Sequence, residues 1–219
     1  MNRRHFILGL AVALPSASHA QAPAYTGARA WTSGPSIAIL SVGDDPRLPL
    51  VRDAVEFWNR SFAELGSGFR LGPVTQTNSA IPADELTALS AAVLSGAASP
   101  APPPEGVRSS PGNIVAALSE GDFISFARRW VNIGKALVAI KSDRAYPFTL
   151  PNVARNVIAH EIGHAIGLGH NSDPAMLMCG RPAPCRPPAF TSATERYFPL
   201  TSEEQSLLLT LHPADWKGR

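Results

Sequence analysis

The chain has 219 residues, 45% of them hydrophobic and 16% charged, which is ample for one core and favours a single globular domain. Its 19 Lys and Arg residues exceed its 17 Asp and Glu residues by only two, and they form no basic stripe. A protein that binds nucleic acid or an anionic membrane surface is therefore not expected.

The first twenty residues predict an exported protein. Residues 1–4 are basic, residues 6–14 are apolar, and residues 18–20 place small side chains at the cleavage-site positions. This is the pattern of a bacterial secretory signal peptide, cleaved after Ala20 or, as the alternative, after Ala22. The apolar run is too short to span a bilayer. The two arginines of the start fit an ordinary signal and a twin-arginine signal equally well, and either route leads to the periplasm or the medium.

After a short segment at residues 21–35, a single domain is expected over residues 36–219. Apolar side chains at helical spacing, ended by Gly66, predict a helix over residues 50–65. Short apolar runs predict buried strands. The expected strands are residues 36–42, 69–77, 113–119 and 135–142, with an edge strand within residues 122–133 and a second helix at residues 84–94. Residues 91–112, rich in Ala, Ser, Pro and Gly, are expected to form an irregular surface insertion.

The most informative segment is residues 160–170, which read H-E-x-x-H-x-x-G-x-x-H. Residues four apart lie on one face of a helix, so His160 and His164 can bind one metal ion together. Gly167 can adopt a positive φ and turn the chain back, which lets His170 act as the third ligand. Three imidazoles leave the fourth position of Zn²⁺ open, which is typical of a catalytic zinc. Glu161 lies a quarter-turn away and is suited to be a general base.

The alternative is that these histidines are ordinary surface or core residues, and the five-residue motif alone is a moderate signal. The extended motif fixes five residues at set spacings in a chain with only six histidines, so zinc binding is favoured. The rest of the expected helix agrees with this interpretation. Its apolar residues fall on the side opposite the histidines, so one face can enter the core. They are Ala154, Ile158, Ile162, Ala165 and Ile166.

Two further features follow the motif. In an exported protein, Cys179 and Cys185 are expected to form a disulfide. The alternative role for Cys179 is that of a zinc ligand, but three histidines and an open position already complete the site. Further on, Thr201 and Glu204 have the spacing of a capping box, which predicts a helix through Leu211.

With the zinc motif, residues 171–180 resemble the metzincin metalloendopeptidases, and most closely their matrixin branch. That family places a methionine-containing tight turn beneath the metal, eight residues after the third histidine, where this chain has Met178. Without the resemblance, Met176 and Met178 would be interpreted only as core residues. The resemblance implies an α+β, zincin-like catalytic domain: a twisted, mostly parallel sheet with an active-site helix and a C-terminal helix. It also implies that the segment after the methionine forms a wall of the substrate pocket.

The chain departs from the family in three respects. Outside the leader and the motif, His212 is the only histidine, so a second, structural zinc is not expected. Both cysteines follow the motif, so no cysteine upstream can block the zinc. Gly180 stands where astacin-like relatives have a tyrosine, so no tyrosine ligand is expected.

These features predict an exported, monomeric zinc endopeptidase that cleaves peptides or proteins. Zinc would activate water, and Glu161 would accept the proton of that water and deliver it to the leaving amine. The edge strand would align an extended peptide by backbone pairing. Two alternatives remain: a secreted zinc-binding module without turnover, and a zinc hydrolase of a non-peptide amide. Zinc binding alone does not require Glu161, which argues against the first; the sequence does not exclude the second.

Overall fold

The computed structural model describes residues 29–95, 101–141, 149–180 and 194–218, together with Cys185 and Ser192. The predicted signal peptide lies outside the described residues, and so do most of the segment at residues 21–35 and residues 96–100 of the expected insertion. The boundaries of the leader and of the N-terminal segment therefore stay predictions.

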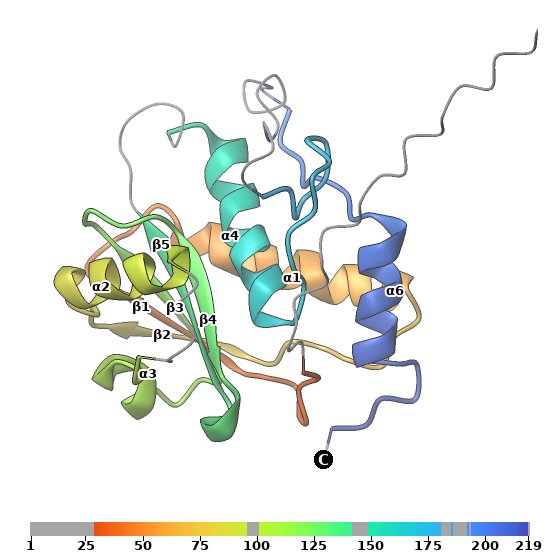
Figure 1. Cartoon of the computed structure of the whole chain (residues 1–219), viewed down its shortest axis with the longest axis horizontal. Coiled ribbons are helices and arrows are strands. Elements are labelled where there is room, and N and C mark those ends of the chain that lie inside the picture. Colours follow the sequence, from red (N-terminus) through yellow and green to blue (C-terminus); the bar gives the residue numbers. More distant parts are fainter. Residues whose placement is uncertain are drawn as a thin grey trace, which may run out of the picture.

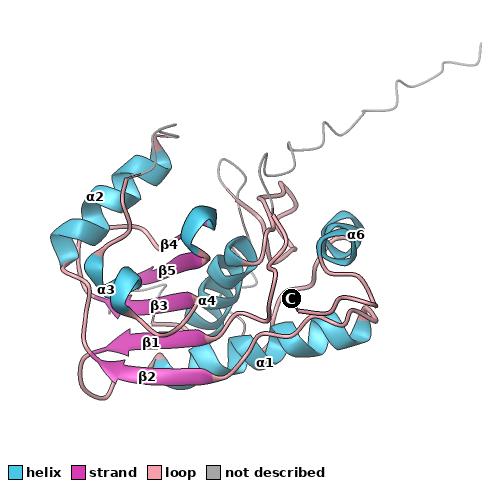
Figure 2. Cartoon of the chain, turned by 90° about the horizontal axis from the view of Figure 1, so that it is seen from below, coloured by secondary structure: helices cyan, strands magenta, loops and turns pink. Residues whose placement is uncertain are grey.

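The centre of the fold is one five-stranded sheet with the strand order β2-β1-β3-β5-β4. The strands are β1 (Ile37–Ser41), β2 (Val74–Asn78), β3 (Ile114–Ser119), β4 (Phe126–Trp130) and β5 (Lys135–Lys141). Neighbouring strands are parallel except for β4, which runs antiparallel to β5 at one edge (Figure 2). The predicted α+β class, with a mostly parallel sheet, is confirmed.

Helices cover both faces of the sheet, which explains why the central strands are continuous apolar runs. The helices are α1 (Leu48–Glu64), α2 (Ala83–Leu94), α3 (Glu105–Ser109), η1 (Val131–Ile133), α4 (Pro151–Ala165) and α6 (Ser202–Leu211). Alternate residues of β1, β3 and β5 pack with α1 and α4 into the larger core, while the intervening residues pack with α2 and α3. In Figure 1, α1 and α4 lie next to each other, with α6 on the far side of α4 from the sheet.

Helix α1 supports α4 from within the larger core. Its predicted apolar stripe is buried, and it ends just before Gly66, which has a φ of 76°. Within this stripe, the indole N–H of Trp58 donates a hydrogen bond of 3.0 Å to the carbonyl of Ala159 in α4. Ala159 immediately precedes the first histidine of the motif, so this bond fixes α4 next to the residues that matter for function.

Two sequence predictions need correction. The strand expected over residues 69–77 begins only at Val74. Before it, the side chain of Asn59 exchanges two hydrogen bonds with the backbone of Leu71 and takes the place of a neighbouring strand. The segment expected to be irregular contains α3, where burial of Val107 compensates for the prolines nearby.

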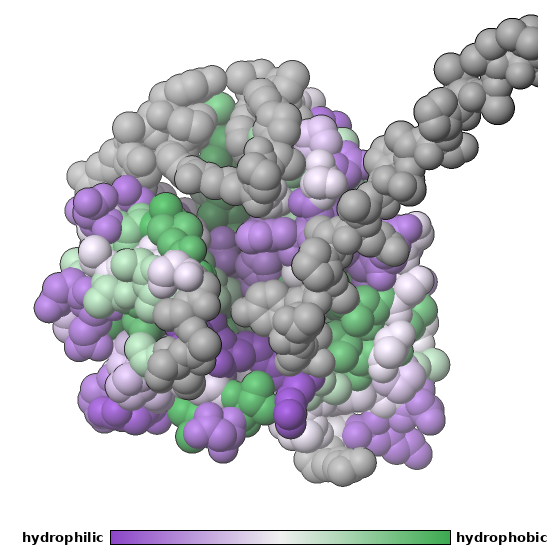
Figure 3. All heavy atoms as spheres, in the orientation of Figure 1, coloured by the Kyte–Doolittle hydropathy of each residue, from purple (hydrophilic) through white to green (hydrophobic). Residues whose placement is uncertain are grey.

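Among the described residues, none of the helices is both long enough and apolar enough to cross a bilayer. On the face shown in Figure 3, hydrophilic and hydrophobic residues are interspersed.

His212 makes the stability of the fold sensitive to acid. Its ring is fully buried and stacks on Phe69 at 4.0 Å. Burial lowers the pKa of His212 to about 4, and the nearby backbone of Ile166 offsets only part of this effect. The unfolded chain, with a histidine pKa near 6.5, therefore takes up this proton first as the pH falls.

Between pH 7 and pH 4, the free energy of unfolding of the parent is expected to fall by about 3 kcal/mol because of His212. In His212→Phe this part of the fall should be absent. Urea unfolding of both proteins at several pH values, with EDTA present, measures this difference. The other histidines are common to both proteins and cancel in the comparison. Equal pH dependence of the two unfolding free energies would contradict the assignment.

Candidate metal centre

The histidine-bearing half of α4 ends in a turn that redirects the chain. Gly167 has a φ of 114°, and its N–H donates a 3.1 Å hydrogen bond to the carbonyl of His164. The next N–H, of Leu168, donates to the carbonyl of Gly163 at 2.9 Å. This pair of bonds is a Schellman motif, which reverses the chain after a helix. The predicted role of Gly167 is thus seen in the backbone, and it carries the chain back to His170.

The turn brings the three predicted ligands together. The Nε2 atom of His170 lies 3.0 Å from Nε2 of His164 and 3.2 Å from Nε2 of His160. Among the described residues, these three form the one group of three or more His, Cys, Asp or Glu side chains with the spacing of a metal site. His160 and His164 are half-buried, and His170 is exposed. The cluster therefore sits at the surface, where a substrate can reach it.

Hydrogen bonds set the tautomer of the two helical histidines. Nδ1 of His160 lies 2.8 Å from the carbonyl oxygen of Leu177, and Nδ1 of His164 lies 2.8 Å from that of Leu168. A carbonyl oxygen only accepts, so each Nδ1 carries the proton and donates it. The lone pair of each Nε2 then points into the cluster, as metal binding requires.

The cluster fits a zinc ion. Four ligands at the usual Zn–N distance of about 2.0–2.1 Å in a tetrahedron are about 3.3 Å apart, close to the separations seen here. Metal binding also requires neutral imidazoles. Burial, together with the nearby His170, lowers the pKa of His164 to about 4, although its bond to Leu168 opposes the shift. His164 is therefore neutral at physiological pH.

Glu161 follows the first histidine and is buried in α4, with 7% of its surface exposed. Burial raises the pKa of Glu161 to about 8, because the carboxylate loses its hydration. A cation bound at the imidazoles would lower this value, since a positive charge favours the ionised form. A carboxyl group with a pKa near neutrality is suited to accept a proton and return it.

Met178 lies beneath α4, on the side away from solvent. It is fully buried. A Cβ placed on Gly163 would come within 2.6 Å of the Sδ atom of Met178, so glycine at this position is what allows the methionine to approach the helix. The turn before it is closed by a 3.2 Å bond from the Met176 N–H to the carbonyl of Asp173. The structure thus places Met178 directly below the helix that carries His160 and His164.

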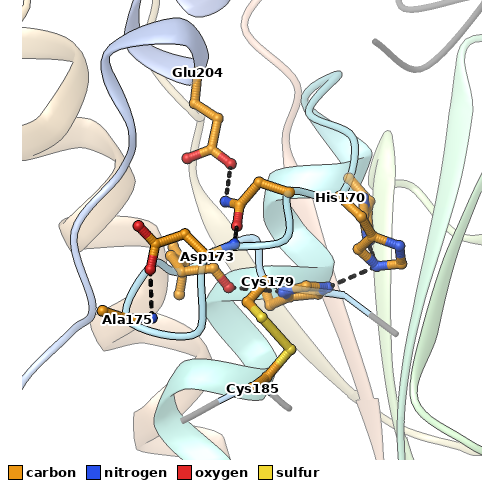
Figure 4. Close-up of a disulfide and its surroundings, with 10 residues drawn as sticks. His170, Asp173, Ala175, Cys179, Cys185 and Glu204 are labelled. Carbon is orange, nitrogen blue, oxygen red and sulfur yellow. Dashed lines mark hydrogen bonds between the residues drawn. A yellow bond between two sulfur atoms is a disulfide. The ribbon is translucent and has the colours of Figure 1, made fainter. Parts of the chain in front are cut away.

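The segment after Met178 is fastened on both sides. Cys179 pairs with Asn171 as an isolated parallel bridge and forms a disulfide with Cys185, with a Cα–Cα distance of 5.7 Å (Figure 4). Asn171 in turn donates a 2.6 Å hydrogen bond from Nδ2 to Glu204, the capping-box residue of α6. The sequence predicted the disulfide and the capping box, but gave no signal that Glu204 reaches the residue next to His170.

A cavity of about 870 Å³ opens at the carboxyl ends of β1, β3 and β5. Leu118 and Ile140 line it from the sheet, and Ala154 and Val157 line it from the first half of α4. Val157 precedes His160 by three residues, so both lie on the same side of the helix. The first half of α4 therefore borders this cavity, and its second half carries the imidazoles.

Comparisons with known proteins found a family match and a similar solved structure. Residues 117–190 match the family model described as Matrixin. Among solved structures, archaemetzincin from Methanopyrus kandleri is similar at 16% sequence identity and a TM-score of 0.37, over 82% of this chain and 96% of that one. A search of the curated proteins found no match to the sequence.

The chain is thus similar to the metzincin zinc metallopeptidases, as the motif predicted. Within that class its match is to the matrixin branch, over a segment that contains the zinc motif and Met178. The family match supports a zinc metallopeptidase.

Proposed function

We propose that the protein is an exported, zinc-dependent endopeptidase whose zinc ligands are His160, His164 and His170. The observation that carries the proposal is the convergence of the three Nε2 atoms at separations of 3.0 and 3.2 Å, next to a buried glutamate. Lone pairs brought this close repel one another unless a proton or a metal cation lies between them.

When bound, zinc supplies a Lewis acid that makes water nucleophilic near neutral pH and polarises the scissile carbonyl. The chain's own contribution to the chemistry is Glu161. Its carboxylate accepts a proton from the attacking water and delivers it to the departing amine. The bonds from His160 and His164 to backbone carbonyls hold the rings in place, so no reorganisation is needed during turnover.

The edge of the sheet offers a place for an extended peptide. Within the described part of the chain, strand β4 pairs only with β5. The other edge of its backbone is therefore free of strand partners there. A peptide that adds to this edge would gain main-chain hydrogen bonds irrespective of its side chains. We infer that β4 positions the substrate, and that the protein acts on peptides or proteins as a monomer.

Export is supported by the disulfide between Cys179 and Cys185, because such bonds persist outside the reducing cytoplasm. The signal-peptide pattern of residues 1–20 gives the route. A zinc-binding module without turnover is disfavoured, since zinc binding by three histidines does not require the buried Glu161 beside them. Hydrolysis of a non-peptide amide would need the same residues.

A library of fluorescence-quenched peptides tests the function. The protein, isolated with its zinc or reloaded with one equivalent, is expected to cleave internal peptide bonds. Chelation should stop cleavage, and added Zn²⁺ should restore it. Elemental analysis is expected to give one zinc per chain, because within the described residues a single group has metal-site spacing. A zinc-loaded protein that cleaves no peptide in the library, yet hydrolyses small amides, would overturn the endopeptidase assignment.

A further inference from the structure

The backbone of Gly180 lies against the ring of His170. A Cβ placed on Gly180 in ideal geometry would lie 2.5 Å from both Cδ2 and Nδ1 of His170, and closer still to Cγ. Side-chain carbons do not approach one another this closely, because van der Waals contact between carbons begins at about 3.5 Å. The space that a side chain at position 180 would fill is thus occupied by the imidazole.

The close contact between Gly180 and His170 follows from the pairing of the segment at Asn171 with the segment at residues 178–180. The N–H of Asn171 donates a 2.9 Å hydrogen bond to the carbonyl of Met178, and the N–H of Gly180 donates a 3.0 Å bond to the carbonyl of Asn171. These bonds fix the register in which Gly180 faces His170. The disulfide between Cys179 and Cys185, drawn in Figure 4, fastens the same segment at the residue before Gly180.

A side chain at position 180 would have to move the ring and not merely its tip. Cγ is the first ring atom of His170, so it can retreat only by rotation about the Cα–Cβ bond or by a shift of the backbone. Nε2 lies at the far end of the ring and is displaced further by the same rotation. The separations of 3.0 and 3.2 Å to the other two imidazoles would then be lost.

Backbone conformation does not by itself require glycine here. The φ of Gly180 lies outside the left-handed region, unlike that of Gly167, so an alanine backbone is permitted. The three atoms that an added Cβ would meet first all belong to the ring of His170.

We propose that Gly180 is a positioning residue for the metal centre. Because Gly180 has no side chain, the His170 ring can pack against its backbone, and this contact holds the ring with Nε2 directed at the zinc. The proposal rests on the proposed function, in which His170 is a zinc ligand. It assigns to Gly180 a role that the zinc motif does not contain, since Gly180 lies ten residues after His170, the last residue of the motif.

The first test is zinc affinity. Competition between the protein and a fluorescent chelator for Zn²⁺ is measured for the parent, Gly180→Ala and the control Gly72→Ala. At Gly72 the φ is also outside the left-handed region, and an added Cβ meets nothing closer than 3.4 Å. Gly180→Ala is expected to weaken zinc binding about 10- to 100-fold, the loss typical when the support of a metal ligand is removed. Gly72→Ala should match the parent.

A double-mutant cycle separates positioning from a general structural role. Gly180→Ala is introduced into the parent and into His170→Ala, and urea unfolding is followed with EDTA present. If the ring is what opposes the side chain, the substitution destabilises the parent but not His170→Ala. This holds even if Gly180→Ala alone fails to fold, because His170→Ala/Gly180→Ala should then fold.

The outcomes keep the two proposals apart. Parent protein that binds no zinc, or His170→Ala that binds it as tightly as the parent, contradicts the proposed metal centre. A parent that binds zinc, with Gly180→Ala equal to it in affinity, overturns the positioning role alone. Equal destabilisation of both backgrounds by Gly180→Ala also overturns it.

Discussion

Replacing Glu161 by Gln is expected to lower peptide turnover by about 10²- to 10⁴-fold while the protein still binds one zinc. The amide has nearly the shape of the carboxylate but cannot accept the proton of the attacking water. The proposed ligands are untouched, and their hydrogen bonds to the carbonyls of Leu177 and Leu168 remain. Folding is also expected to survive, because a neutral amide is cheaper to bury than a carboxylate.

Zinc content and peptide cleavage are measured on the same preparations of parent and Glu161→Gln. A suitable control is Glu203→Gln, since Glu203 is exposed in the first turn of α6 and is not part of the histidine cluster. Cleavage by Glu161→Gln at the parent's rate would mean that another group accepts the proton. Loss of zinc together with activity would mean that Glu161 supports the metal and is not only a base.

The parts of the fold that the sequence predicts well are those specified by local patterns. The apolar stripe of α1, the capping box at Thr201 and Glu204, and the zinc helix all depend on residues within one or two turns of each other. The three histidines are close in sequence for the same reason. Their spacing on a helix, followed by Gly167, is enough to bring them together.

The corrections came where distant contacts override local patterns. Strand β2 begins later than expected because the side chain of Asn59, on α1, bonds both the N–H and the carbonyl of Leu71. These groups are then not available to a neighbouring strand. Helix α3 was missed because its neighbouring prolines disfavour regular structure, whereas burial of Val107 against the sheet favours it. A proline at the helix start, where Pro104 is the N-cap, leaves no helical hydrogen bond unmade.

The supports of the metal centre were not predictable for a related reason. Glu204 has two roles: it caps α6, and it accepts a hydrogen bond from Asn171. Only the capping role can be predicted from the local sequence. Gly163 and Gly180 are informative only through what an added side chain would meet: Met178 in one case and His170 in the other. Gly163 thus leaves room for Met178 beneath the zinc helix, and Gly180 leaves room for the ring of His170, which is itself part of the cluster.

The second large effect is expected for His164→Ala, which should lose both zinc and peptide cleavage. The centroid of the His164 ring lies 4.7 Å from that of His160 and 4.6 Å from that of His170, so His164 is in contact with both other proposed ligands. Without it, two imidazoles remain, and an open site with two ligands holds zinc poorly. The loss of affinity should exceed the about 100-fold seen when only the hydrogen-bond partner of a ligand is removed.

The His164→Ala substitution should lower the stability of the fold only slightly, in contrast to its effect on zinc binding. The Leu168 carbonyl loses the hydrogen bond from Nδ1, which contributes about 1 kcal/mol, and the Schellman bonds at Gly167 remain. His212→Phe is the matched control, because it removes a histidine that is buried against Phe69 and away from the cluster. Elemental analysis after dialysis, with circular dichroism on the same samples, should give one zinc for the control and none for His164→Ala, both folded. A full equivalent of zinc in His164→Ala would show that the metal is held elsewhere, and the convergence of the three rings would then need another explanation.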